Sequence, residues 1–290
     1  MNKSTTGKQL ISAAWAVLKQ DKELMVLPVL GGVFASACIG LIAGVGYVAG
    51  AFNSAVATDP TSTTVSPLGY AFGALIAYIT TTIALFFQAA LIFGAMERLD
   101  GGDPTVASSI AAARKKLGAI MIWALIATTI GLILRAISER GGVLARIGSA
   151  VAGVAWTVAT FFVLPVVIFE GINSFAAVKR SGQIISQRWG TVLRTNLRFS
   201  LQLFLAAAAA MGAIFGGSVL AIANIDSGRG LLILVGLFIA LLGVFGLIAV
   251  IVVANALSGY VRAVLYRHAV GQPVPGISEE ILAGAFQIKE

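Results

Sequence analysis

Few residues in this sequence have the types and spacing that catalysis requires. Asp100 and Asp103 stand in the segment DGGDP, and neighbouring carboxylates can hold a divalent cation beside a pyrophosphate in lipid-transferring enzymes. Such enzymes need more carboxylates than this sequence places nearby. Two glycines followed by Asp103 and Pro104 are an adequate turn and helix start. The segment therefore predicts a turn and the start of a helix.

The single histidine and the single cysteine leave little room for other chemistry. An intramembrane serine protease needs a serine paired with a base, and His268 lies at the far end of the last apolar run. Cys38 lies inside the first apolar run. Because it is the single cysteine of the sequence, it can form neither an intrachain disulfide nor a metal-thiolate cluster. The sequence predicts a protein that is not an enzyme and has no metal site and no cofactor.

Glu170 is the carboxylate with the most unusual setting. It ends an apolar run and lies within one or two helical turns of Lys179 and Arg180. A carboxylate at the edge of a membrane is unfavourable unless it is paired. One interpretation is a structural lock that fixes the next helix, and the other is a carboxylate that couples transport or binds substrate. The predicted lock comprises Glu170, Arg180, Ser181 and Trp189.

Basic residues form a second group of candidates. Arg194 and Arg198 stand four residues apart at the start of the fifth apolar run. They could extend to phosphates as ordinary interfacial arginines, or they could line a groove that binds a lipid headgroup. The residues predicted to contact lipid or another anion are Lys179, Arg180, Arg188, Arg194, Arg198, Arg114, Lys115 and Lys116.

The composition predicts a membrane location for these candidates. The chain is 58% apolar and 11% charged, with a mean hydropathy of +0.96, which leaves too little charge to cover a soluble domain of 290 residues. The net charge of +8 comes from short basic clusters between apolar runs. This pattern favours anionic lipid over nucleic acid as the partner.

The apolar runs predict an all-α, polytopic protein that forms a single membrane domain over residues 1–290. Each of the six runs is long enough for a membrane crossing of roughly 20 helical residues. The predicted spans are residues 24–51, 70–95, 117–137, 143–169, 192–223 and 231–259. Amphipathic patterns predict helices on the cytoplasmic surface at residues 8–22, 104–116, 173–190 and 278–286. The first of these could instead pack on the helix bundle.

The basic residues predict the orientation of these spans. With the N-terminus in the cytoplasm, 16 of the 20 basic residues fall on the inner side, which predicts that both termini are cytoplasmic. A surface helix followed by two membrane helices occurs three times in this scheme, which suggests a threefold internal repeat.

Polar and small residues inside the spans predict how the helices pack. Gln88 and several threonines are expected to join helices, and no ionisable residue falls at the midplane. Because Pro28 and Pro165 lie near interfaces, no helix break is expected at mid-membrane. Small-residue pairs in the first and fifth spans predict close helix packing or, alternatively, a homodimer; they are formed by Gly40, Gly44, Gly46, Gly50, Gly212 and Gly216.

A short motif resembles a known family. The pattern is an LP-containing helix end, an acidic residue, A-x-x-R-S and then W-G, at Leu164, Pro165, Glu170, Ala177, Arg180, Ser181, Trp189 and Gly190. It resembles a bacterial family of six-helix membrane proteins classed as a domain of unknown function. It is also distantly similar to the membrane domain of bacterial glycerophosphodiester phosphodiesterases. The resemblance implies a bacterial inner membrane, and the phosphodiesterase catalytic domain itself is absent.

Together these features predict a non-catalytic protein of the bacterial inner membrane. It would organise or sense the membrane, or act as an accessory subunit, by engaging anionic lipid through its basic amphipathic helices. The expected partners are membrane lipids and a membrane protein or a second copy, with no role for nucleic acid. The alternative is a transporter or lipid-moving protein with a groove near Glu170, Arg194 and Arg198.

Overall fold

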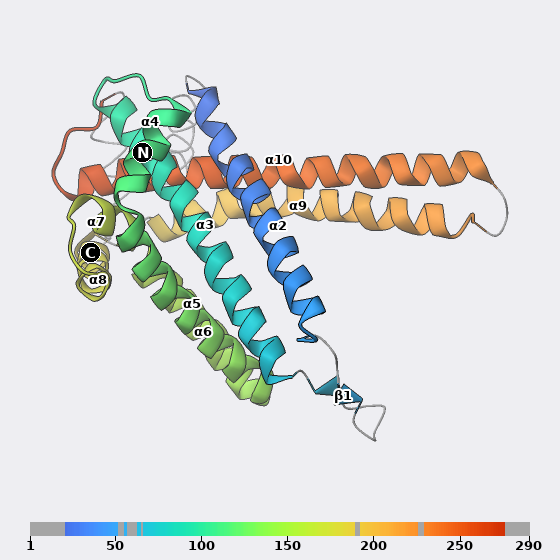
Figure 1. Ribbon diagram of the computed structural model, residues 1–290. Helices are drawn as coiled ribbons and strands as arrows, with labels where there is room; N and C mark the ends of the chain where they lie inside the picture. Colours follow the sequence, from blue (N-terminus) through green and yellow to red (C-terminus); the bar gives the residue numbers. More distant parts are fainter. Residues whose placement is uncertain are drawn as a thin grey trace. The chain divides into compact units, whose positions relative to one another are not determined.

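The computed structural model describes residues 21–51, 55–56, 63–64, 66–188, 192–225 and 229–275. Its elements are almost all helical (Figure 1). The long helices are α2 (Val26–Val48), α3 (Pro67–Leu99), α5 (Leu117–Arg140), α6 (Val143–Ala159), α9 (Val192–Ile222) and α10 (Gly230–Ala269). The short elements are the 3₁₀ helix η1 (Lys22–Met25), strands β1 (Ala55–Val56) and β2 (Thr63–Thr64), and helices α4 (Val106–Lys115), α7 (Val163–Phe169) and α8 (Ser174–Arg188).

Six helical segments are long and apolar enough to cross a membrane. They are Lys22–Val48, Pro67–Leu99, Leu117–Arg140, Val143–Phe169, Leu203–Ile222 and Gly230–Ala269. Large apolar side chains such as Leu41, Leu144 and Phe215 are exposed along them, as expected where lipid covers a protein surface. The structure therefore confirms six candidate spans, although several predicted boundaries were wrong.

Local sequence accounts for the corrected boundaries. The second span begins earlier than predicted because Ser66 caps α3 by accepting a hydrogen bond from the Gly69 N–H, at 3.0 Å, with Pro67 as its first residue. The start of α4 is capped by Thr105 and Ser108, which exchange bonds of 3.0 Å, and not by Asp103. Helix α10 continues ten residues past the predicted end at residue 259, up to a turn in which Gly271 has a φ of 79°.

The fourth predicted span, residues 143–169, has the predicted bounds but consists of two helices, α6 and α7, with a turn between them towards its Phe169 end. Pro165 is the reason. In a continuous helix its ring would collide with the carbonyl of Phe161, and Phe161 would also lose its hydrogen bond. The structure instead makes a turn at residues 160–162 and begins a new helix at Val163, so that Pro165 falls in the first turn, where proline is tolerated.

The chain divides into two compact units. One comprises residues 21–187 and 262–273, and its centre is α3, which contacts α2, α4, α5 and α7 (Figure 1). Small residues allow the closest approaches, since Gly31 of α2 faces the Phe87 ring and Gly94 of α3 faces Ser109 of α4. We refer to this unit, residues 21–187 and 262–273, as the α3 unit.

The other unit contains residues 188–261, in which α9 and α10 lie side by side and antiparallel (Figure 1). Gly217, Gly236 and Gly243 sit where the backbones of the two helices meet. The glycines predicted for this contact, Gly212 and Gly216, face open space, as do Gly40 and Gly44 on α2. The prediction of close packing was therefore wrong for these four glycines among the described residues, whereas Gly46, which belongs to the same predicted set, is buried on α2.

Two of the predicted surface helices exist as helices. α4 corresponds to predicted residues 104–116, and α8 corresponds to residues 173–190. The predicted helix at 278–286 and nearly all of that at 8–22 lie outside the described residues. The membrane-surface location of the helices and the internal repeat stay predictions.

Candidate functional site

The polar side chains of the α3 unit gather around the last turns of α10. Residues 262–269, called here the α10 end segment, belong to the α3 unit. Ala263, Val264 and Leu265 are buried and provide its apolar contacts. Three other side chains of the segment, from Arg262, Tyr266 and Arg267, bind different elements of the unit.

Tyr266 connects the α10 end segment to Glu170. The Tyr266 hydroxyl donates to Glu170 Oε1 at 3.2 Å, and its ring stacks on Phe169 with the centroids 5.9 Å apart. Arg180 Nε lies 3.4 Å from Glu170 Oε2. The structure thus brings together two members of the predicted lock, Glu170 and Arg180, and adds Tyr266, which the sequence gave no reason to choose. A partly exposed ion pair of this kind stabilises a fold by at most about 1 kcal/mol.

Ser181 joins α8 to the break between α6 and α7. Its Oγ accepts a hydrogen bond of 3.1 Å from the Phe162 N–H, and both residues are buried. That N–H lies at the start of α7, where no helical carbonyl is available to accept it. Ser181 therefore satisfies a backbone donor that the Pro165 break leaves without a helical acceptor. Its partner is a backbone group, whereas the lock was predicted from charged side chains.

We expect Ser181→Ala to lower the free energy of unfolding by about 1–3 kcal/mol, because a buried N–H loses its acceptor. Ser186→Ala is the matched control on the same helix, since Ser186 is exposed and its loss should change stability by less than about 0.5 kcal/mol. Unfolding by titration with SDS would measure both variants. Equal stability of the two would contradict the assigned role of Ser181.

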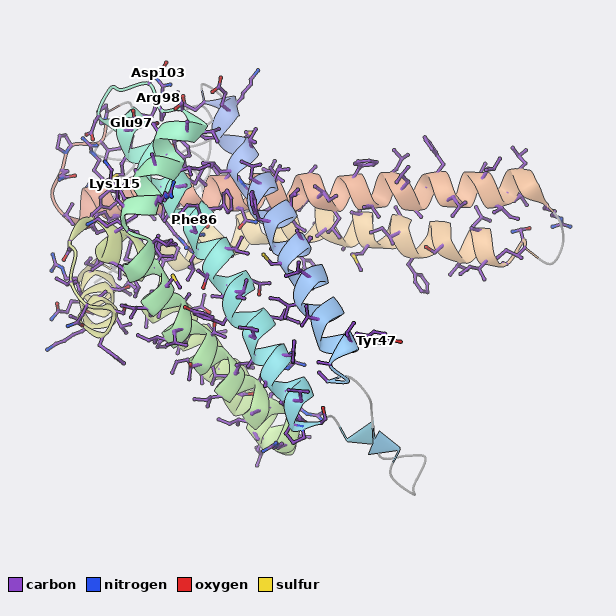
Figure 2. All side chains as sticks on the ribbon, in the orientation of Figure 1. Tyr47, Phe86, Glu97, Arg98, Asp103 and Lys115 are labelled. Carbon is purple, nitrogen blue, oxygen red and sulfur yellow. The ribbon has the colours of Figure 1, made fainter. Side chains whose placement is uncertain are left out.

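Two arginines bind the two aspartates of the DGGDP segment. Arg267 donates to Asp100 Oδ1 and, from its Nε, to the Pro273 carbonyl at 2.6 Å. Arg98 contacts Asp103 at 2.7 Å and also binds both carboxylate oxygens of Asp21, with Nε at 2.8 and 2.9 Å from them. Figure 2 shows Arg98, Asp103 and Glu97 near the end of α3. Asp100 and Asp103 are therefore each engaged by a different arginine.

Arg262 has the least expected setting. Its Nη1 donates to Gln88 Oε1 of α3 at 2.7 Å, and its guanidinium carbon lies 5.0 Å from the centre of the Phe161 ring. Its Nε is buried and has no hydrogen-bond partner among the described residues. Sequence reasoning missed this residue because it lies three positions past the predicted end of the sixth span. The available signal was Gln88, an amide inside the second span.

The predicted anion-contact residues fall into three groups. Arg114, Lys115 and Lys179 are exposed, Lys116 is partly exposed, and Lys115 is labelled in Figure 2. In the part of the chain that is described, none of these four residues forms an ion pair, whereas Arg180 pairs with Glu170. Arg188 ends α8, and Arg194 and Arg198 lie in α9, but the described portion does not include their side chains. Trp189 lies outside it altogether.

Six apolar helices of membrane-spanning length define a multi-pass membrane protein. The chain belongs to a family of unknown function, DUF6159, which matches residues 68–274. The match includes α3 to α10 and therefore most of the residues around the α10 end segment. Comparisons with curated proteins and with solved structures gave no match.

Proposed function

We propose that this protein is a non-catalytic component of a bacterial inner membrane that engages anionic lipid through the basic residues of α4 and α8. Through this contact it organises or senses the membrane, or serves as an accessory subunit of a membrane complex. Both termini are cytoplasmic in this proposal. The distant similarity to phosphodiesterase membrane domains belongs to the same proposal, which assigns no role to catalysis, nucleic acid or a cofactor.

The observation that carries the proposal is the basic end of α4. Arg114, Lys115 and Lys116 directly precede Leu117, the first residue of the apolar helix α5. Lys115 and its neighbours form no ion pair with another described residue. These three positive charges directly precede a candidate membrane span. In this proposal they lie at the depth of the lipid phosphates. Each such residue near an anionic surface contributes about 1 kcal/mol of attraction.

Helix α8 offers a second surface of the same kind. Its packed face consists of small residues and isoleucine: Ser174, Ala177, Ser181, Ile184 and Ile185. Phe175 lies outside this packed face and is 76% exposed, with the exposed Lys179 one turn further along. An exposed aromatic ring beside a lysine is typical of a surface that lies in the headgroup region.

The test is a lipid titration followed by native mass spectrometry. A variant with Arg114, Lys115 and Lys116 all changed to glutamine is compared with a control in which Arg135, Arg140 and Arg146 are changed in the same way. We expect the α4 variant to lose at least about tenfold in affinity for phosphatidylglycerol relative to phosphatidylcholine, because it loses three attractive charges. The control, altered near the other end of α5, should keep the wild-type ratio.

An equal loss in both triple variants would indicate a general charge effect and would contradict the proposal. An unchanged ratio in the α4 variant would contradict it as well. The same spectra, taken after minimal removal of lipid, show the mass of any bound protein. A defined partner or a second copy would support the accessory-subunit form of the proposal over direct sensing of lipid.

A further inference from the structure

Arg262 carries a charge that its surroundings do not balance. Its guanidinium contacts a neutral amide oxygen from Gln88 and the face of the Phe161 ring. The aromatic ring attracts the cation, but more weakly than a carboxylate would in the same buried position. A buried arginine without an anionic partner is strongly unfavourable, and membrane proteins pair such residues or place them where an ion or substrate binds.

The carboxylates near the α10 end segment bind other groups. Glu170 accepts from Tyr266 and faces Arg180, while Asp100 accepts from Arg267. No carboxylate in the described ranges forms an ion pair with Arg262. The α3 unit therefore supplies negative charge to the neighbouring cations and leaves Arg262 with neutral partners.

The remaining donors of Arg262 define what could bind there. Gln88 accepts one N–H from Nη1, and the buried Nε–H has no acceptor in the part of the chain that the structure describes. The Phe161 ring lies 5.0 Å from the guanidinium carbon. An arginine offers its donors as a planar fork, which matches the oxygen spacing of a phosphate group. Arg262 as a whole is partly exposed, although its Nε is buried.

We propose that Arg262 is the centre of an internal anion-binding site that takes a phosphate group, with Gln88 positioning the guanidinium. The phosphate comes from a lipid headgroup or from free inorganic phosphate, which share this chemistry. The site does not involve α4 or the exposed face of α8. The proposal of this site is therefore tested independently of the proposed function.

The test measures thermal unfolding of the detergent-purified full chain at constant ionic strength. Separate samples receive dihexanoyl phosphatidic acid, inorganic phosphate or dihexanoylglycerol, which has the same acyl chains and no phosphate. At about 100 times its dissociation constant, a phosphate probe should raise the Tm by on the order of 5 °C. Arg262→Gln should abolish the rise. Arg135→Gln, which removes an exposed arginine, should preserve it.

Gln88→Glu keeps the proposal testable if Arg262→Gln does not fold. This nearly isosteric change places a carboxylate within reach of Arg262, so we expect a higher Tm without any probe and no further rise with one. If Arg262 already had an anionic partner in the chain, the new carboxylate would instead lower the Tm.

The pattern across probes identifies the source of the phosphate. A rise with phosphatidic acid alone supports a lipid headgroup, and an equal rise with inorganic phosphate supports a free anion. No rise with either would overturn the proposal, as would a rise that persists in Arg262→Gln or Gln88→Glu. A rise that dihexanoylglycerol reproduces would show that acyl chains act without a phosphate, with the same consequence.

Discussion

Replacing Arg98 with alanine is expected to lower the free energy of unfolding by about 2–4 kcal/mol. The reason is Asp21, whose side chain is only 2% exposed and whose two carboxylate oxygens both accept from Arg98. Breaking a fully buried ion pair by removing one partner typically costs 3–5 kcal/mol. The side chain of Arg98 is itself 24% exposed, which lowers the expected value.

The matched comparison is Asp103→Asn, which removes the other carboxylate of Arg98. Asp103 is 91% exposed, so water compensates for the lost pair and we expect a change of less than about 1 kcal/mol. SDS titration measures both variants. The double variant with Asp21→Asn and Arg98→Ala should recover part of the loss, because the stranded charge is gone. Similar losses for Arg98→Ala and Asp103→Asn would contradict this account.

Apolar run length was enough to predict six spans, since a membrane crossing depends on local composition alone. It did not reveal the turn within the fourth span, between α6 and α7. The break before α7 depends on Pro165, which the sequence shows, and on Ser181, which accepts from the Phe162 N–H across 19 positions. Whether a proline kinks a helix or interrupts it depends on whether another element satisfies the freed backbone groups. Whether such an element is present depends on the tertiary structure and cannot be read from the local sequence.

Contacts of the candidate site between residues close in the sequence could be predicted, whereas contacts between distant residues could not. Glu170 and Arg180 are ten residues apart, and their proximity followed from a short turn between two helices. Arg262 and Gln88 are separated by 174 positions. The drop in hydropathy after residue 259 suggested the end of the span, but burial of Val264 and Leu265 against the α3 unit extends α10 to Ala269. Only the folded chain shows that a charged residue there is internal.

The glycines show the same limit for helix packing. Spacing by four residues identified Gly212 and Gly216 as a small-residue pair, and such pairs are common in membrane helix contacts. The structure uses Gly217, the adjacent residue, which lies on the buried face. A shift of one residue rotates a helix position by about 100°. Spacing alone therefore cannot choose between neighbouring faces when small residues occur on both.

Gly217→Leu is expected to lower stability by about 3 kcal/mol or more. A Cβ added at Gly217 would lie 2.5 Å from both the Gly236 carbonyl oxygen and the Ala240 nitrogen of α10. Both are backbone atoms, so no rotamer change can make room and the two helices must separate. Inside a bilayer, helices are held together mainly by close packing, because lipid is as apolar as their side chains. Separation therefore removes most of what holds this hairpin together.

Gly216→Leu provides a control one residue away with the same change in volume. A Cβ at Gly216 meets nothing within 4 Å, so we expect a change within about 0.5 kcal/mol. SDS titration gives the loss of stability, and hydrogen exchange of peptides from α9 and α10 shows whether that loss is local to the hairpin. If the two leucine variants behaved alike, α9 and α10 would not be in contact through Gly217. If only Gly216→Leu were destabilised, that residue would belong to an interface with another molecule, such as a second copy of the chain.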